Sequence, residues 1–210
     1  VSSPEHDRLR TLLAPAYASG DPGTVDWPGV FRQGQVAIAD LLRRSGDAAV
    51  AGAQIIVWPE TAAMVPAHEE AALRTTAGQL ARTHQVYLAL ALGVIRWPMG
   101  SGSTAGAPAE PRVIDNRMIL LGPQGGVVAQ YRKTIAVPGP EAALLVPGDG
   151  QIPIVDTPYG RVALAICFDL DFPHLLRRAA GADLLLVAAE DWPGISPYHG
   201  DMARLRAIEG

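Results

Sequence analysis

A chain of 210 residues, 49% of them hydrophobic and 18% charged, is long enough for one domain with a well-buried core. The formal net charge is −4 and no basic run exceeds two residues, which argues against nucleic-acid binding. The N-terminus lacks the pattern of a signal peptide and no apolar run approaches the ~18 residues that span a bilayer, so any membrane anchor is expected outside this chain.

The chain opens on a polar stretch and then alternates helix and strand. Residues 1–28 are rich in Pro, Gly and Ser, and we expect them to form a loose lead-in segment. Apolar residues recur at helical spacing over 29–47, which predicts a helix. The short apolar run at 53–58, rich in β-branched residues and ended by Pro59, predicts a buried strand that runs into a loop.

A second helix and strand follow in the same order. Leu73, Ala77 and Leu80 share one face of a predicted helix, and the run at 86–95 predicts a strand. Residues 97–112 are rich in Gly, Ser, Pro and Ala and are expected to form a loop.

Two antiparallel hairpins are predicted next. The first joins 113–121 to 126–131 through the turn "GPQG", and the second covers 152–166 and turns at residues 157–160.

The remaining residues return to alternating elements. A helix is predicted over 172–180, a strand over 183–189, and the start of an amphipathic helix from about residue 199. Helices that alternate with fully apolar strands, together with hairpins, predict an α/β domain over 29–210 with helices covering a mixed sheet. The chain ends at a predicted helix terminus, so we expect the C-terminal part of the domain to be missing.

Three reactive side chains each follow a predicted strand, where loops gather and ligands bind in α/β proteins. Glu60 in "IIVWPET" can act as a general base if burial raises its pKa, or it can simply favour the dipole of a following helix. Lys133 is the only lysine beside 16 arginines. It can stabilise an oxyanion, or it can be an exposed surface charge. Cys167, the only cysteine, can be a nucleophile or a small core residue.

Other chemistry has little support. One cysteine cannot form an internal disulfide, and no set of His, Cys and carboxylate residues has the spacing of a metal site, so no metal or cofactor is expected. His174 and His199 lie downstream of Cys167 and can approach it, but their spacing does not require this.

Four stretches in order resemble the nitrilase (carbon-nitrogen hydrolase) superfamily over about residues 29–209: "WPETA", "YRKTIAVPGPE", "AICFD" and "HGDMARLRAIE". The local sequences of these motifs are most similar to those of the apolipoprotein N-acyltransferase branch. Three positions differ from that branch, since Phe168 and Asp169 stand where Tyr and Glu are common and Glu190 stands where Asn is common.

The resemblance implies a four-layer αββα sandwich, here incomplete at both ends. It implies that Glu60 takes a proton from Cys167, whose thiolate forms a thioester with the substrate. Lys133 and the backbone N–H of Phe168 would hold the oxyanion, and Glu141 would be the second glutamate of the family. Trp192 and Tyr198 are further candidates for substrate contact.

The resemblance leaves three functions open. The first is acyl transfer from a phospholipid to an amine at the extracytoplasmic face of a membrane. The second is hydrolysis of a small amide by a soluble, cytoplasmic amidase or carbamoylase that pairs into a homodimer. The third is an inactive homologue or fragment.

Overall fold

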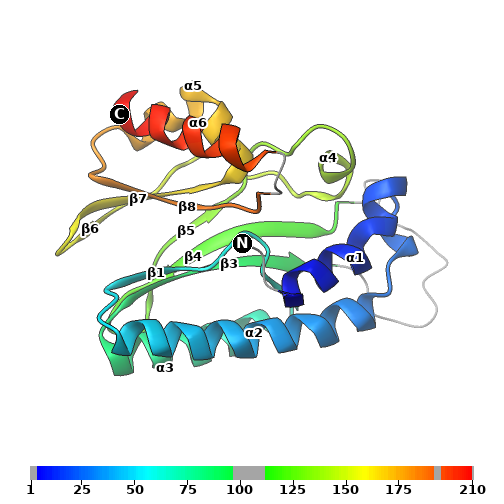
Figure 1. The fold of residues 1–210 in the computed structure, drawn as a ribbon, viewed down its shortest axis with the longest axis horizontal. Helices are drawn as coiled ribbons and strands as arrows, with labels where there is room; N and C mark the ends of the chain where they lie inside the picture. Colours follow the sequence, from blue (N-terminus) through cyan, green and yellow to red (C-terminus); the bar gives the residue numbers. More distant parts are fainter. Residues whose placement is uncertain (1–3, 97–111, 192–194, 210) are drawn as a thin grey trace.

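The computed structural model describes residues 4–96, 112–191 and 195–209 (Figure 1). Two sheets lie face to face between two layers of helices, which confirms the predicted αββα sandwich. The predicted loop at 97–112 lies outside the described residues, except for Arg112.

The larger sheet has the strand order β1-β3-β4-β5, with β2 also paired to β3. Its strands are β1 (Ile55–Val57), β2 (Ala63–Pro66), β3 (Tyr87–Ile95), β4 (Ile114–Leu121) and β5 (Val127–Arg132). The smaller sheet has the order β6-β7-β8, from β6 (Ile154–Thr157), β7 (Gly160–Ile166) and β8 (Leu184–Ala188). Both predicted hairpins are confirmed, since β4 pairs antiparallel with β5 and β6 with β7.

Helices α2 (Trp27–Val50) and α3 (Glu70–His84) cover the outer face of the larger sheet. Helices α5 (Pro173–Leu176) and α6 (Ser196–Glu209) cover the smaller sheet, and α1 (Pro4–Ser19) and α4 (Pro140–Leu144) lie together at one end of the sandwich (Figure 1). Leu90, Ile119 and Leu164 are fully buried in the core, which β3, β4 and β7 share. Strands covered on both faces explain the near-continuous apolar runs in the sequence.

Strands β1 and β2 both pair with β3, and the segment that joins them is three residues longer than the part of β3 between their pairing positions. Val57 pairs with Ala89 and Ala63 pairs with Leu92, so five residues on one strand face two on the other. The extra residues belong to "WPETA", and they leave the sheet as a loop. Because the loop is held at both ends by parallel pairing to β3, it presents Glu60 at a fixed point beside the sheet. Sequence reasoning predicted the first strand and missed β2.

The expectation of a loose segment over 1–28 was wrong for most of its length. Residues 4–19 form α1, which is held because Leu9, Leu13 and Ala16 recur on one face and are buried with residues of α2 and α4. Pro15 lies inside this helix, where it removes one backbone donor. The Pro-rich composition therefore concealed a helix that tertiary packing stabilises.

The predicted helix over 172–180 is broken into short pieces. A 3₁₀ helix covers Cys167–Asp171, α5 covers Pro173–Leu176, and a second 3₁₀ helix covers Arg177–Ala179. The proline at the start of α5 fixes φ and lacks an N–H, so the turn that carries Cys167 cannot continue directly into α5.

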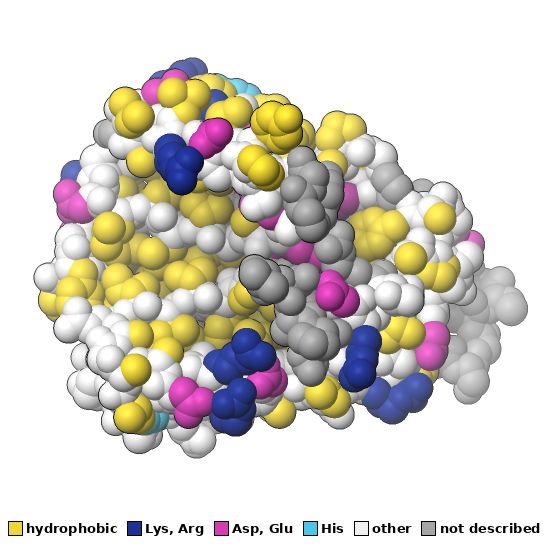
Figure 2. Space-filling view, in the orientation of Figure 1, with side chains coloured by type: hydrophobic (Ala, Val, Ile, Leu, Met, Phe, Trp, Pro, Cys, Tyr) yellow, Lys and Arg dark blue, Asp and Glu magenta, His cyan; other side chains and the backbone are white. Residues whose placement is uncertain are grey.

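Hydrophobic side chains are partly exposed between the two sheets on the side away from α1 and α4, in the left half of Figure 2. The residues of β1 are only half-buried, and Leu184 at the start of β8 is 39% exposed. In the part of the chain that the structure describes, no helix combines the length and apolar character needed to cross a membrane.

Candidate active site

Glu60 is buried, with 4% of its surface exposed, in the loop between β1 and β2. Its Oε1 accepts hydrogen bonds from Asn116 Nδ2 at 2.8 Å and from Lys133 Nζ at 2.9 Å. Trp58, two residues earlier, is buried and donates its indole N–H to Ser45 Oγ on α2. The loop is therefore anchored to the helix layer on one side of Glu60.

Lys133 is also buried, directly after β5, with 1% exposure. Its Nζ lies 2.9 Å from Glu60 Oε1 and 2.7 Å from Glu141 Oε1, so one ammonium bridges two carboxylates. The other oxygen of Glu141 accepts the backbone N–H of Val137 at 2.6 Å. The predicted approach of Glu60, Lys133 and Glu141 is therefore seen in the geometry.

The charge states in this group follow from burial and pairing. Burial alone lowers the pKa of Lys133, but the charges of Glu60 and Glu141 outweigh that effect, so its pKa is raised. Burial raises the pKa of Glu141, and the ammonium of Lys133 opposes this. Lys133 is therefore a fixed positive charge at neutral pH.

Cys167 lies at the end of β7, at the first residue of a 3₁₀ turn, with φ of 44°. A non-glycine residue in this left-handed region is uncommon and is concentrated at functional sites. Thr61, next to Glu60, also has a positive φ of 48°. Two of the strained positions thus lie at the same place in the fold.

Burial raises the pKa of the Cys167 thiol well above its ordinary range, and the negative charge of the nearby Glu60 carboxylate adds to this rise. The charge of Lys133 acts in the opposite direction. The resting cysteine therefore keeps its proton, and a neighbouring base is needed to make the thiolate. Glu60 lines the same cavity and is the carboxylate that acts most strongly on the thiol.

Asp169 joins the turn of Cys167 to the loop of Lys133. It is fully buried and accepts hydrogen bonds from Tyr131 Oη at 2.9 Å and from the backbone N–H of Ile135 at 2.9 Å, with a longer one from Thr134 N. Burial raises the pKa of Asp169 to about 6, although these hydrogen bonds oppose the rise. Sequence analysis noted Asp169 only as a departure from a family pattern.

Replacement of Asp169 tests this connection. We expect Asp169→Ala to lower the free energy of unfolding by about 2–4 kcal/mol, because it leaves buried donors of Tyr131 and Ile135 without an acceptor. Asp171→Ala, two residues along the same turn, is the matched control and is expected to change stability by less than about 1 kcal/mol. Denaturant unfolding followed by circular dichroism measures both, and equal losses would contradict the assignment.

His199 on α6 contacts the backbone of Cys167, which sequence spacing did not require. Its Nε2 lies 3.1 Å from Cys167 O and its Nδ1 lies 2.6 Å from Asp191 Oδ1. Cys167, Asp191 and His199 bring one potential metal-ligand atom each within 4.8 Å of one another. Because both ring nitrogens of His199 already have hydrogen-bond partners, the set is better described as a support for the Cys167 turn.

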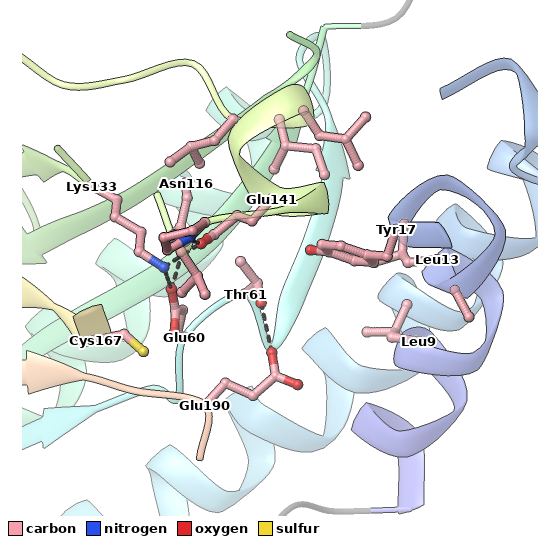
Figure 3. A pocket seen from close by; sticks show the side chains of 16 residues that line it. Leu9, Leu13, Tyr17, Glu60, Thr61, Asn116, Lys133, Glu141, Cys167 and Glu190 are labelled. Atoms are coloured by element: carbon pink, nitrogen blue, oxygen red, sulfur yellow. Dashed lines mark hydrogen bonds and ion pairs between the residues drawn. The ribbon is translucent and has the colours of Figure 1, made fainter. Parts of the chain in front are cut away.

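A cavity of about 480 Å³ opens onto this group (Figure 3). Its lining includes Glu60, Lys133, Glu141 and Cys167 at one end and side chains of α1 at the other. The structure therefore brings these four predicted site residues together in the lining of one cavity.

The remaining predicted site residues are placed differently. Phe168 follows Cys167 in the 3₁₀ turn, and its ring contacts Phe172 edge to face. Tyr198 is 75% exposed and is not part of the cavity lining. Trp192 lies outside the described residues.

Several residues that line the cavity were not predicted from the sequence. Asn116 lies with Asp115 and Arg117 in a polar run inside the mostly buried strand β4, a pattern that could have marked it, since buried polar groups need partners. Leu9, Leu13 and Tyr17 of α1 were hidden by the Pro-rich composition. Leu9 and Leu13 fit a helical period, which was the available clue.

A partly buried cysteine at a strand end, in one cavity with a carboxylate and an ammonium of an αββα sandwich, defines the class of thiol-dependent carbon-nitrogen hydrolases and their relatives. Residues 17–210 match the carbon-nitrogen hydrolase family. The chain belongs to that family, as its resemblance to the nitrilase superfamily predicted.

Characterised relatives include amidases and an acyltransferase. The chain is 30% identical over 223 aligned residues to deaminated glutathione amidase of Bos taurus, covering 96% of this chain and 66% of that protein. The rat enzyme of the same name is 39% identical over 111 residues, 48% of this chain and 34% of that protein. Apolipoprotein N-acyltransferase of Geobacter metallireducens is 31% identical over 212 residues, 88% of this chain and 38% of that protein.

Solved structures agree with the fold. A variant of the amidase from Nesterenkonia sp. AN1, with the acetamide moiety of fluoroacetamide added covalently at its active-site cysteine, superposes with a TM-score of 0.64 at 25% identity. The match covers 84% of this chain and 66% of that one. The chain thus spans between about a third and two thirds of the length of the curated relatives named above.

Proposed function

We propose that this chain hydrolyses the carbon-nitrogen bond of an amide through a thioester on Cys167. The observation that carries the proposal is the position of Cys167 at the wall of the same cavity in which Glu60 and Lys133 form an ion pair. That arrangement supplies a nucleophile, a base and a fixed positive charge at one place.

In the first half of the reaction Glu60 takes the thiol proton and the sulfur of Cys167 attacks the amide carbon. The developing oxyanion is held by Lys133 Nζ and by the backbone N–H of Phe168. When the carbon-nitrogen bond breaks, Glu60 returns the proton to the leaving amine. The acyl group remains on Cys167 as a thioester.

In the second half a water molecule attacks the thioester carbon and gives a proton to Glu60. The oxyanion forms again beside Lys133, the carbon-sulfur bond breaks, and the proton returns to the sulfur. The carboxylic acid leaves and the enzyme is restored. Glu141 keeps the Lys133 ammonium in place through both halves, since it pairs with that group independently of Glu60.

Acyl transfer, our principal expectation from the sequence, is the less well supported reaction. Several relatives and the solved structures are amidases, and the match to the acyltransferase covers 38% of that protein. Because that acyltransferase is 31% identical over 88% of this chain, we keep acyl transfer as the second reaction to test, with phospholipid as the acyl donor.

The experiment is intact-protein mass spectrometry after rapid acid quench. We expect an adduct of the acyl mass, with release of ammonia, when the protein is mixed with primary amides, and neither in Cys167→Ala. Phospholipid is offered in parallel as the donor for acyl transfer. Circular dichroism confirms that both proteins are folded. Ammonia release by folded Cys167→Ala, or a folded wild type that forms no adduct from any donor, would overturn the proposal.

A further inference from the structure

The cavity has an apolar end built by a helix that lies almost wholly outside the family match. That match begins at residue 17, whereas α1 covers Pro4–Ser19. Leu9 and Leu13 of α1 line the cavity and are nearly fully buried, with exposures of 1% and 6%. Figure 3 shows them projecting from α1, across the cavity from Lys133 and Cys167.

Helix α4 completes the apolar end and connects it to the reactive end. Leu144 and Leu145 line the cavity beside Ile114, and Leu144 is buried in one cluster with Leu9 and Leu13. Glu141, on the same short helix, binds Lys133. One short helix therefore carries both a part of the apolar wall and the carboxylate that binds the ammonium.

The charged groups of the lining are mostly acidic. The lining carries three carboxylates, Glu60, Glu141 and Glu190, and one cation, Lys133, which already pairs with Glu60 and Glu141. Among the described lining residues there is no arginine. Tyr17 adds a hydroxyl that points into the cavity (Figure 3), and burial raises its pKa, so it stays a neutral hydrogen-bonding group.

These features of the cavity distinguish between amide substrates by the end of the substrate that lies remote from the amide group. An aliphatic chain that enters from Cys167 toward α1 leaves water for a leucine-lined wall, which is favourable. A carboxylate at the same end would lose its hydration against the leucine-lined wall without gaining a free cation.

We propose that α1 forms the specificity wall of this cavity and selects neutral primary amides with an aliphatic acyl chain, against amides that end in a carboxylate. The amide carbon lies at Cys167, ammonia leaves, and the chain contacts Leu9, Leu13 and Leu144. The proposal rests on the proposed hydrolase function and names its substrate class.

The first test compares three primary amides on the wild-type protein: acetamide, hexanamide and adipamic acid. The last two have equal length and differ only at the far end, methyl against carboxylate. We expect kcat/KM for hexanamide to exceed that for acetamide by up to about 250-fold, because each of its four additional methylenes contributes about fourfold when buried. Adipamic acid is expected to fall at least about 30-fold below hexanamide, as a carboxylate without a partner is strongly disfavoured in such a site.

A variant then tests the role of α1 itself. Leu13→Phe fills part of the cavity and is expected to lower the ratio of hexanamide to acetamide kcat/KM at least about tenfold, because the chain loses its space. A general loss of folded protein would not move that ratio. Thr11→Phe, at an exposed position of the same helix, is the matched control and should keep the wild-type ratio.

Binding to Cys167→Ala, measured by titration calorimetry, separates this proposal from the hydrolase function. Tighter binding of hexanamide than of acetamide and adipamic acid supports the specificity wall even if no amide is turned over by the wild type, which would overturn the hydrolase function alone. Turnover with equal rates for all three amides, or a preference for adipamic acid, would overturn the specificity wall and leave the hydrolase function standing.

Discussion

Lys133→Arg is expected to lower kcat/KM for an amide substrate by at least about 10³-fold, which is the upper range for loss of one oxyanion donor. The charge is kept, but the guanidinium is a flat fork of five donors and cannot occupy the position of a compact ammonium between two carboxylates. Lys133 is 1% exposed, so the larger group has no room to move into solvent. Steady-state kinetics with primary amides measures the effect.

Stability measurements separate this chemical effect from unfolding. Overpacking by arginine is expected to cost about 1–3 kcal/mol, whereas Lys133→Met leaves Glu60 and Glu141 buried without a cation and is expected to cost about 3–5 kcal/mol. The arginine variant should therefore unfold at higher denaturant concentration than the methionine variant while being equally inactive. Arginine activity within tenfold of wild type would refute the role of Lys133 as a point-like oxyanion donor.

Glu60→Gln is expected to lower kcat by about 10²- to 10⁴-fold, the usual contribution of a general base. The amide keeps the shape of the side chain and can still accept the hydrogen bond of Asn116, but it cannot take the proton of Cys167. Since the thiol pKa is raised by burial, the spontaneous thiolate fraction is too small to compensate. The chemical steps should slow while KM changes little.

The matched control makes the same chemical change away from the cavity. Glu69→Gln, at the partly exposed start of α3, should keep wild-type kinetics. Mass spectrometry after quench adds a second readout, because Glu60→Gln should show no rapid formation of the Cys167 adduct. A burst of adduct at the wild-type rate would show that another group accepts the proton.

The sequence was informative where a reactive residue follows an apolar strand. Glu60, Lys133 and Cys167 come from three different strand ends, and strand ends of packed sheets converge, so their approach could be predicted from position and family resemblance together. The fold class followed from the same apolar runs, because strands covered on both faces show no alternation.

The parts that sequence reasoning missed depend on tertiary contacts. Helix α1 contains Pro15 and is stabilised by burial of Leu9 and Leu13, which local propensity does not register. Strand β2 follows its neighbour after a loop of five residues and looks like more loop. The residues around Cys167 could not distinguish an amidase from an acyltransferase, because both reactions pass through the same thioester.

The hydrogen bonds of the Asp169 carboxylate affect how the segments that carry Cys167 and Lys133 unfold locally. Its hydrogen bonds join the backbone after Lys133 to the turn of Cys167, two segments 34 or 35 residues apart in sequence. Local unfolding occurs in cooperative units, and groups that share a buried acceptor belong to one unit. We therefore expect Cys167 and Lys133 to lose their positions in the same opening event rather than one after the other.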